Sequence, residues 1–221
     1  MFRKHLLACS ACLFVTAPAL AENQIWSTIN LKAPSPDGAR FEFELNNELR
    51  FQPDGDLDTI EIRPGLSYAL GDHLKLSGGY LYAVQRRSGP DSEEHRLWQQ
   101  VSYAIAKAGS GTFNGRTRIE QRWRVGADRT GWRARQQFAF EHPIGSTGLN
   151  LNISDELTFG LNTTDWGHQE GIQENRAKAV VEWKTGEADW ELGYMNQHRN
   201  GIGGAEDEDN HHIVIGVSAG F

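Results

Sequence analysis

The stretch FEFELNNELRF, residues 41–51, alternates apolar and polar side chains. Phe41, Phe43, Leu45, Leu49 and Phe51 occupy odd positions, and the even positions between them carry glutamates, an asparagine and an arginine. A helix would mix both kinds of side chain on one face, whereas a strand turns successive residues to opposite faces of a sheet. The stretch is therefore predicted to be a β-strand with one apolar and one charged face.

The same period of two runs through almost all of the chain after residue 21, where helical patterning is absent. Eleven segments are strand-like: 24–33, 39–52, 57–70, 73–86, 94–106, 112–125, 132–142, 148–160, 175–185, 188–199 and 210–221. Single-chain bacterial barrels have even strand numbers. We therefore predict ten strands with the segment 24–33 outside the barrel, or twelve if the pattern hides one.

The connections between these segments alternate in length. Longer ones are expected at 87–94, 126–131, 162–173 and 200–210, and short ones at 71–72, 109–111, 145–148 and 185–187. Short turns at one end and longer loops at the other are typical of outer-membrane barrels. The predicted fold class is all-β, a transmembrane antiparallel β-barrel in the bacterial outer membrane.

The first 21 residues have the pattern of a secretory signal peptide. Arg3 and Lys4 precede an apolar run over 6–15 and the small-residue triplet at 19–21. Cleavage after Ala21 is expected to leave a single domain, residues 22–221. Both cysteines, Cys9 and Cys12, lie in the removed segment, so disulfides and cysteine metal sites are not expected.

The charge balance excludes two classes of protein. The formal net charge is −7 and becomes more negative once Arg3 and Lys4 are removed, which argues against nucleic-acid binding through bulk charge. A mean hydropathy of −0.55 and the lack of a later long apolar run argue against a helical membrane protein. A β-barrel passes both tests, because its strands are only half apolar.

The stretch RTRIEQRWR, residues 116–124, places charges on every second position. In a membrane barrel this face points into the lumen, where charges of both signs must be paired. The predicted lumen charge network consists of Arg116, Arg118, Glu120, Arg122, Arg124, Arg133, Arg135, Glu42, Glu44 and Glu182, and Glu141 is a further expected partner of the arginines. A structural network is one interpretation of this ladder, and an anion-selective constriction is the other.

Several motifs resemble the family of bacterial outer-membrane proteins known as domain of unknown function 2490. They are SGGYLY at 77–82, RTRIEQRW at 116–123, SDELTF at 154–159, ENR at 174–176, ELGYMNQHR at 191–199 and a final strand ending in Phe221. The resemblance implies an outer-membrane β-barrel whose terminal aromatic residue is read by the barrel-assembly machinery. It implies no activity.

A barrel-embedded hydrolase acting on outer-membrane lipid is an alternative, because such enzymes place Ser, His and acidic groups near one rim. The candidates are His95, His198, His211 and His212, with Asp91, Ser92, Glu93 and Asp209 near some of them in sequence. His211 and His212 are adjacent and would point to opposite faces of a strand, so one metal ion is not expected to bind both.

The sequence therefore favours a structural barrel or a narrow channel with a lumen lined by Arg and Glu. No catalytic, cofactor-binding or metal-binding residues are assigned. Outer-membrane lipid and the barrel-assembly machinery are the expected partners, and nucleic acid is not one. A soluble secreted β-protein is the third alternative, because a soluble sheet with one wet face gives the same alternation.

Overall fold

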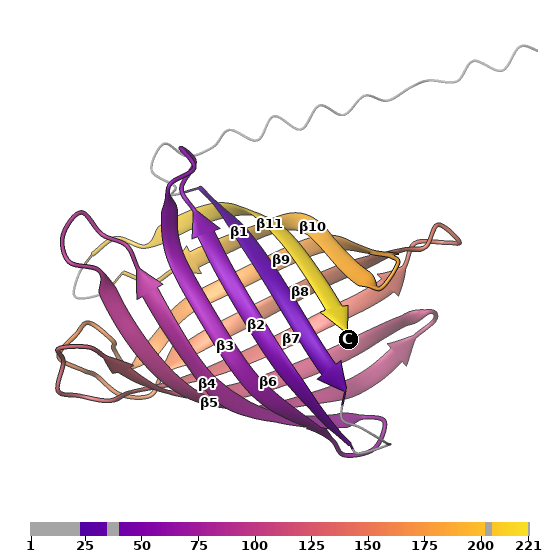
Figure 1. Ribbon diagram of the computed structural model, residues 1–221, viewed down its shortest axis with the longest axis horizontal. Helices are drawn as coiled ribbons and strands as arrows, with labels where there is room; N and C mark the ends of the chain where they lie inside the picture. Colours follow the sequence, from indigo (N-terminus) through magenta and orange to yellow (C-terminus); the bar gives the residue numbers. More distant parts are fainter. Residues whose placement is uncertain (1–22, 35–39, 202–204, 221) are drawn as a thin grey trace, which may run out of the picture.

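A computed structural model describes residues 23–34, 40–201 and 205–220 of the protein (Figure 1). The predicted signal peptide and Phe221 lie outside these residues. Eleven strands form one closed barrel within them. Their bounds are β1 Gln24–Pro34, β2 Phe41–Phe51, β3 Leu57–Ala69, β4 Leu74–Gln85, β5 Ser92–Ala108, β6 Gly111–Arg124, β7 Gly131–Pro143, β8 Leu149–Gly160, β9 Gly171–Thr185, β10 Ala188–Arg199 and β11 Glu208–Gly220.

The barrel closes through its first and last strands. Every strand from β1 to β11 is antiparallel to the next along the chain, and β1 then pairs with β11 in parallel, from Gln24 opposite His212 to Lys32 opposite Gly220. Strands that alternate in direction give an odd-numbered barrel two end strands of the same direction, so one parallel ladder is required. The predictions of ten or twelve strands, and of a first segment outside the barrel, are therefore wrong.

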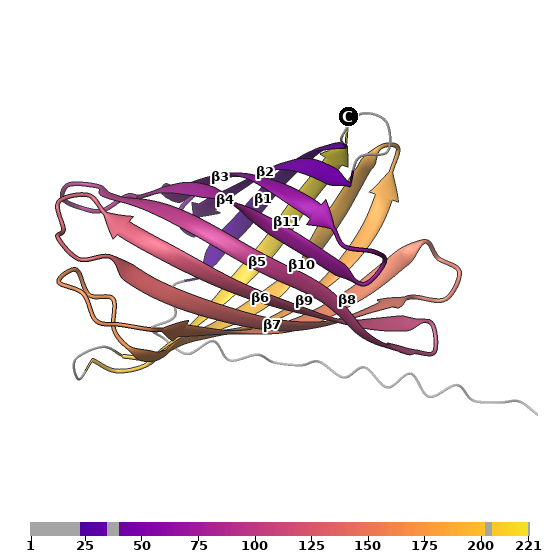
Figure 2. The ribbon, with the colours of Figure 1, turned by 90° about the horizontal axis from the view of Figure 1, so that it is seen from below.

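The connections gather at two rims (Figure 2). The long-loop rim carries the connections 52–56, 86–91, 125–130 and 161–170 and the described residues 200–201 and 205–207, and the short-turn rim carries 70–73, 109–110, 144–148 and 186–187. Gly109 (φ 61°) and Gly186 (φ 62°) adopt left-handed backbone in the two tightest turns. A two-residue hairpin turn needs this conformation, and glycine adopts it without steric cost.

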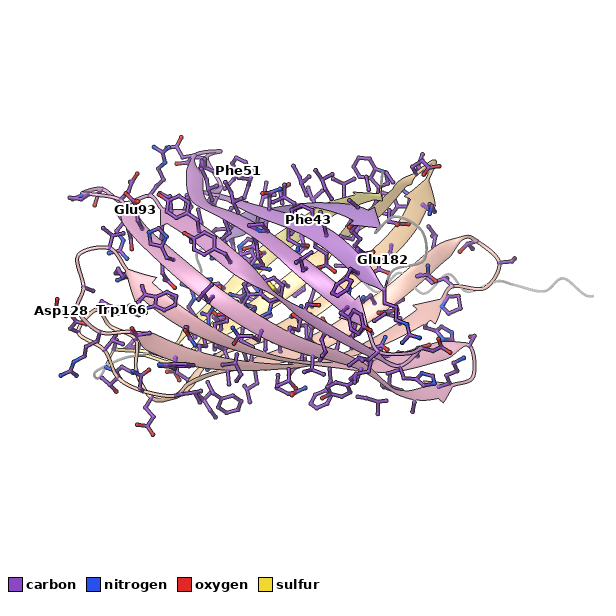
Figure 3. All side chains as sticks on the ribbon, turned by 60° about the horizontal axis from the view of Figure 1, so that its bottom comes forward. Phe43, Phe51, Glu93, Asp128, Trp166 and Glu182 are labelled. Atoms are coloured by element: carbon purple, nitrogen blue, oxygen red, sulfur yellow. The ribbon has the colours of Figure 1, made fainter. Side chains whose placement is uncertain are left out.

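The barrel has an apolar outside and a polar inside (Figure 3). Large apolar side chains such as Phe43, Leu66 and Ile213 are about half exposed on the outer face, and few apolar residues are buried. The interior instead buries charged groups, with Glu61 at 4% exposure and Glu120 at 1%. A soluble barrel has the opposite distribution, because burial of apolar surface drives its folding.

Some polar residues share the apolar side of their strands and are hydrogen-bonded to one another there. Gln136 accepts a hydrogen bond from Thr117 (2.6 Å) and donates one to Tyr103 (3.1 Å), and Asn175 Nδ2 donates to both carboxylate oxygens of Asp155. The Thr117–Gln136 and Asp155–Asn175 pairs each join neighbouring strands, whereas Tyr103 of β5 and Gln136 of β7 are separated by β6. In the described part of the chain, no helix has the length and apolar character needed to cross a membrane.

Candidate functional site

The candidate site is the lumen, which contains two cavities. One, of about 540 Å³, lies toward the long-loop rim, and the other, of about 490 Å³, lies toward the short-turn rim. Arg116, Gln137, Ser154 and Lys178 line both, so the cavities meet at these four residues, which we call the waist. The lumen is therefore hollow on both sides of a narrow polar layer.

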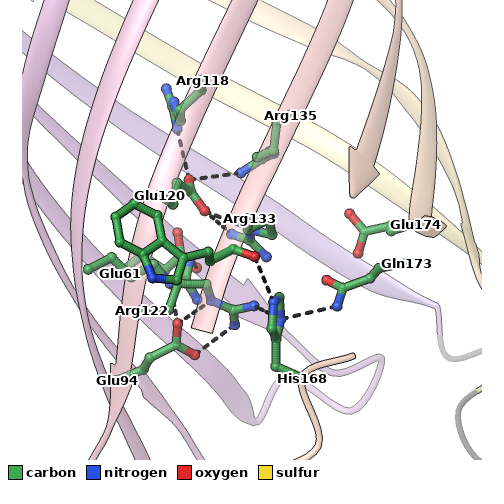
Figure 4. Close-up of polar contacts among 12 residues, drawn as sticks. Glu61, Glu94, Arg118, Glu120, Arg122, Arg133, Arg135, His168, Gln173 and Glu174 are labelled. Carbon is green, nitrogen blue, oxygen red and sulfur yellow. Dashed lines mark hydrogen bonds and ion pairs between the residues drawn. The ribbon is translucent and has the colours of Figure 1, made fainter. Parts of the chain in front are cut away.

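The charged side chains of β6 point into this lumen, with Glu120 at the centre of the row (Figure 4). Arg133 of the neighbouring strand donates to Glu120 through Nε (2.7 Å) and also through its terminal nitrogen. Nη1 of Arg135 lies 3.6 Å from Glu120 Oε1, and Nη1 of Arg118 lies 3.7 Å from the same atom. The carboxylate of Glu120 thus forms ion pairs with three arginines from two adjacent strands.

Two more carboxylates extend the network toward the long-loop rim. Arg122 donates two parallel hydrogen bonds, of 2.6 and 2.8 Å, to the two carboxylate oxygens of Glu94. In this geometry a guanidinium binds a carboxylate most strongly. Arg96 connects Glu94 (2.6 Å) with Glu61 (3.2 Å). Glu61 in turn also contacts Arg50 and Arg63, at 3.4 and 3.0 Å.

Carboxylates from β8 and β9 complete the network. Glu156 is bound by Arg116 and by Arg135, whose Nε donates at 2.9 Å. Glu174 pairs with Arg176 and lies 3.7 Å from Arg199. Throughout this network, a carboxylate is shared by two or three arginines.

Of the predicted network, the structure brings Arg118, Arg133 and Arg135 to Glu120. It pairs Arg116 with Glu156 and Arg122 with Glu94, and Arg124 donates to the carbonyl of Trp166.

The other predicted glutamates lie elsewhere. Glu44 and Glu42 pair with Lys75, at 2.8 and 3.8 Å. Glu182 accepts a hydrogen bond from Asn152, and Glu141 accepts one from Asn114. The expected pairing of the arginines with these four residues is therefore wrong, because the strand register puts all four toward the short-turn rim.

The glutamates that lie outside the predicted network but pair with arginines of the lumen follow the same alternation as the predicted residues. Glu61, Glu94, Glu156 and Glu174 are the main partners of the arginines, together with Glu120. Each falls on the inward-facing positions of its strand, so the period of two marked them as candidates. Only the register between strands identifies which arginine each one meets.

The connection 161–170 folds into the long-loop end of the lumen. Trp166 lies 5.1 Å from Arg122 and 5.0 Å from Arg124, in cation–π contact with both, and its indole donates to the carbonyl of Arg129. His168 is 3% exposed and donates from Nε2 to the carbonyl of Trp132. Its Nδ1 then accepts hydrogen bonds from Arg122 (3.3 Å) and Gln173 (3.1 Å), so the imidazole is neutral.

Comparison with known proteins places the chain in a family. The family described as "Protein of unknown function (DUF2490)" matches residues 23–208. The chain belongs to this family. The DUF2490 protein described here is also 29% identical to an uncharacterized protein of Methylorubrum extorquens over 205 residues, which cover 87% of this chain and 88% of that protein. No solved structure matches. The family inferred from the motifs is confirmed, and neither comparison assigns an activity.

The four candidate histidines of this DUF2490 protein have separate hydrogen-bond partners. His95 is hydrogen-bonded to Tyr80, and His211 to Tyr194, both on the outer face. His198 lies at the rim, 3.0 Å from Asp209. The buried His212 contacts Gln197 inside the barrel.

Within the described ranges, the hydrogen bonds between Ser and His are limited to Ser110 and His142, at 3.5 Å in the short-turn rim. Ser92 instead lines the larger cavity. No group of three or more metal-ligating side chains is found in the same ranges. The acid–histidine pair of His198 and Asp209 therefore lacks, in these ranges, the serine hydrogen-bonded to its histidine that a Ser–His–acid site requires.

A pH dependence follows from His168. Burial lowers the pKa of its imidazole, and Arg122 and Arg133 act in the same direction. In the unfolded chain a histidine is protonated near its ordinary pKa of about 6.5. The unfolded state of this DUF2490 protein then binds more protons, so stability is expected to fall as the pH drops below about 6.5.

The measurement is the difference in melting temperature of the purified protein between about pH 7.5 and about pH 5.5, a range that brackets that pKa. We expect His168→Gln to reduce this difference. His142→Gln, in the short-turn rim, is the matched control and is expected to leave it unchanged. Equal pH dependence in both variants and the wild type would contradict the assignment.

Proposed function

We propose that this protein is an outer-membrane β-barrel whose lumen is a narrow passage for small anions. The outward apolar face supports the membrane location, because contiguous exposed apolar surface of this extent marks contact with another apolar phase. The closed sheet leaves no unpaired strand edge, as a lipid environment requires. The signal-peptide pattern at 1–21 supports export from the cytoplasm, which an outer-membrane location requires.

Aromatic residues near both ends of the outer face support the same location. Trp132 lies by the long-loop rim and is 39% exposed, and Trp190 lies by the short-turn rim and is 38% exposed, beside Trp183 in register. Outer-membrane barrels carry such girdles at the two lipid–water interfaces. We further propose that β11, together with Phe221 that follows it in the sequence, is the contact with the barrel-assembly machinery.

The observation that carries the anion passage is the charge of the lumen. Twelve Arg or Lys side chains line the larger cavity in the described structure, against six glutamates, and Glu120 is a seventh carboxylate in contact with this wall. Cationic linings select anions, because walls of low dielectric that carry positive charge raise the concentration of anions between them. The waist then acts as the constriction between the two cavities.

Location is tested first by fractionating cells that produce the full chain. We expect the protein in the outer-membrane fraction, with a mobility on denaturing gels that changes on heating, as folded barrels show. Recovery as a water-soluble periplasmic protein would refute the membrane barrel.

Conduction is tested with the purified protein in planar bilayers under a potassium chloride gradient. We expect small currents whose reversal potential indicates preference for chloride. Arg116→Gln removes a cation from the waist and is expected to lower that preference, because Arg116 lines both cavities. Arg129→Gln changes an exposed arginine that lines neither cavity and is the matched control. Absence of current from folded protein would refute the passage.

A further inference from the structure

Arg118 is the buried cation of the lumen with the weakest acidic partner. Its Nε and Nη2 both donate to Gln100 Oε1, at 2.9 and 2.6 Å, and Gln100 is a neutral amide. The nearest carboxylate oxygen, Glu120 Oε1, is 3.7 Å away and is shared with Arg135. With 6% exposure, Arg118 also has little contact with water. A charge in this state is costly unless a further anion is present.

The neighbours of Arg118 increase this cost. Arg135 stands directly opposite it on the next strand, a pairing that is destabilising between like charges. The positive charges of Arg63 and Arg116 also act on Arg118. Arg63 in addition has a buried Nε with no hydrogen-bond partner. Several guanidinium groups therefore face one region of the cavity with more positive charge than the glutamates balance.

The remaining groups around this region are suited to bind oxygen atoms. The waist lies next to Arg118 along β6 and adds Arg116, Lys178, the amide of Gln137 and the hydroxyl of Ser154. The guanidinium carbon of Arg118 lies 5.0 Å from the centre of the Trp98 ring, in cation–π contact. Guanidinium forks bind phosphate and carboxylate groups through paired hydrogen bonds.

We propose that Arg118, Arg63 and the waist form a binding site for a small oxyanion carrying at least two negative charges, such as phosphate. The excess of positive charge in this cavity exceeds what one monovalent anion balances. A cavity of about 540 Å³ also admits a larger solute that carries such a group. This inference rests on the proposed function, because the anion reaches the site through the lumen.

The test is calorimetric titration of the purified, detergent-solubilised protein with inorganic phosphate, against chloride at equal ionic strength. We expect saturable binding of phosphate and none of chloride. Arg118→Gln removes one charged hydrogen-bond donor and is expected to weaken phosphate binding roughly tenfold or more. Arg199→Gln makes the same chemical change at the partly exposed rim of the same cavity and is expected to weaken it by about twofold or less.

A second readout does not depend on measuring affinity. In phosphate-free buffer we expect Arg118→Gln to melt at a higher temperature than the wild type, because the change removes a buried cation that faces Arg135. Phosphate should raise the melting temperature of the wild type and reduce this difference. Heat-dependent gel mobility establishes that each variant is folded.

The proposal is overturned by equal responses to phosphate and chloride, by equal losses in the two variants, or by a lower melting temperature of folded Arg118→Gln in phosphate-free buffer. Phosphate binding without bilayer current would support the site and refute the passage. Current without phosphate binding would refute the site and support the passage.

Discussion

Replacing Glu120 by glutamine is expected to destabilise the folded barrel by about 3–5 kcal/mol. Glu120 is 1% exposed and contacts three arginines, which are themselves largely buried. Glutamine has nearly the same shape but no charge, so the variant keeps the packing and leaves Arg118, Arg133 and Arg135 without this carboxylate. The cost is that of unbalanced buried charge rather than of an empty space.

The measurement is the free energy of unfolding from denaturant titrations of the protein in detergent or lipid vesicles. Glu182→Gln is the matched control, because Glu182 is a half-buried carboxylate of the same lumen that accepts a hydrogen bond from Asn152 and has no ion pair within 4 Å in the described structure. We expect a change of less than about 1 kcal/mol in the control. Equal effects in both variants would show that Glu120 has no special role in the network.

Gly79→Ala is expected to destabilise the barrel by about 1–3 kcal/mol or more, or to prevent closure. Gly79 lies opposite Gly65 on the neighbouring strand, and the ring of Trp98 lies against both. A Cβ at Gly79 would lie 2.7 Å from the Cα of Gly65 and closer still to the carbonyl oxygen of Pro64. These are backbone atoms, so the clash is relieved only by moving a strand.

The same denaturant titration measures this effect. Gly89→Ala is the control, because a Cβ there meets no atom within 4 Å and the backbone does not require glycine. We expect the control to unfold like the wild type. A Gly79→Ala variant with wild-type stability would mean that β3 and β4 separate easily at this point.

The period of two was sufficient to locate the strands, because it is a local property of the sequence. The predicted segment 188–199 has the same bounds as β10, and 112–125 differs from β6 by one residue at each end. The outward-facing Gln136 and Asp155 break the apolar pattern because each has a polar partner on an adjacent strand. Such partners depend on contacts that no single segment reveals.

The predicted number of strands is wrong for a different reason. The period of two predicts a strand at 24–33, but the rule of even strand numbers predicts that this segment lies outside the barrel. Its partner β11 lies at the far end of the chain, and nothing in either segment encodes a parallel pairing. The strand-like pattern of 24–33 was thus correct, and the rule of even strand numbers does not hold for this barrel.

The candidate site shows the same division between local and long-range information. Alternation put Arg118, Glu120 and Arg122 on one face, and the structure has these side chains buried in the lumen. The choice of Glu94 rather than Glu44 as a partner of Arg122 depends on how far each strand is shifted along its neighbour. A shift of this kind is a property of the closed barrel and not of any one segment.

The parallel ladder between β1 and β11 also bears on the order in which the barrel is assembled. Every other ladder joins strands that follow one another in the chain, whereas Asn30 and Ser218, in contact across this ladder, are 188 residues apart. Bringing such distant residues together costs the most chain entropy, and parallel pairing is slightly less stable per residue. We therefore expect this ladder to form last and to open first, which would expose two strand edges to a neighbouring chain.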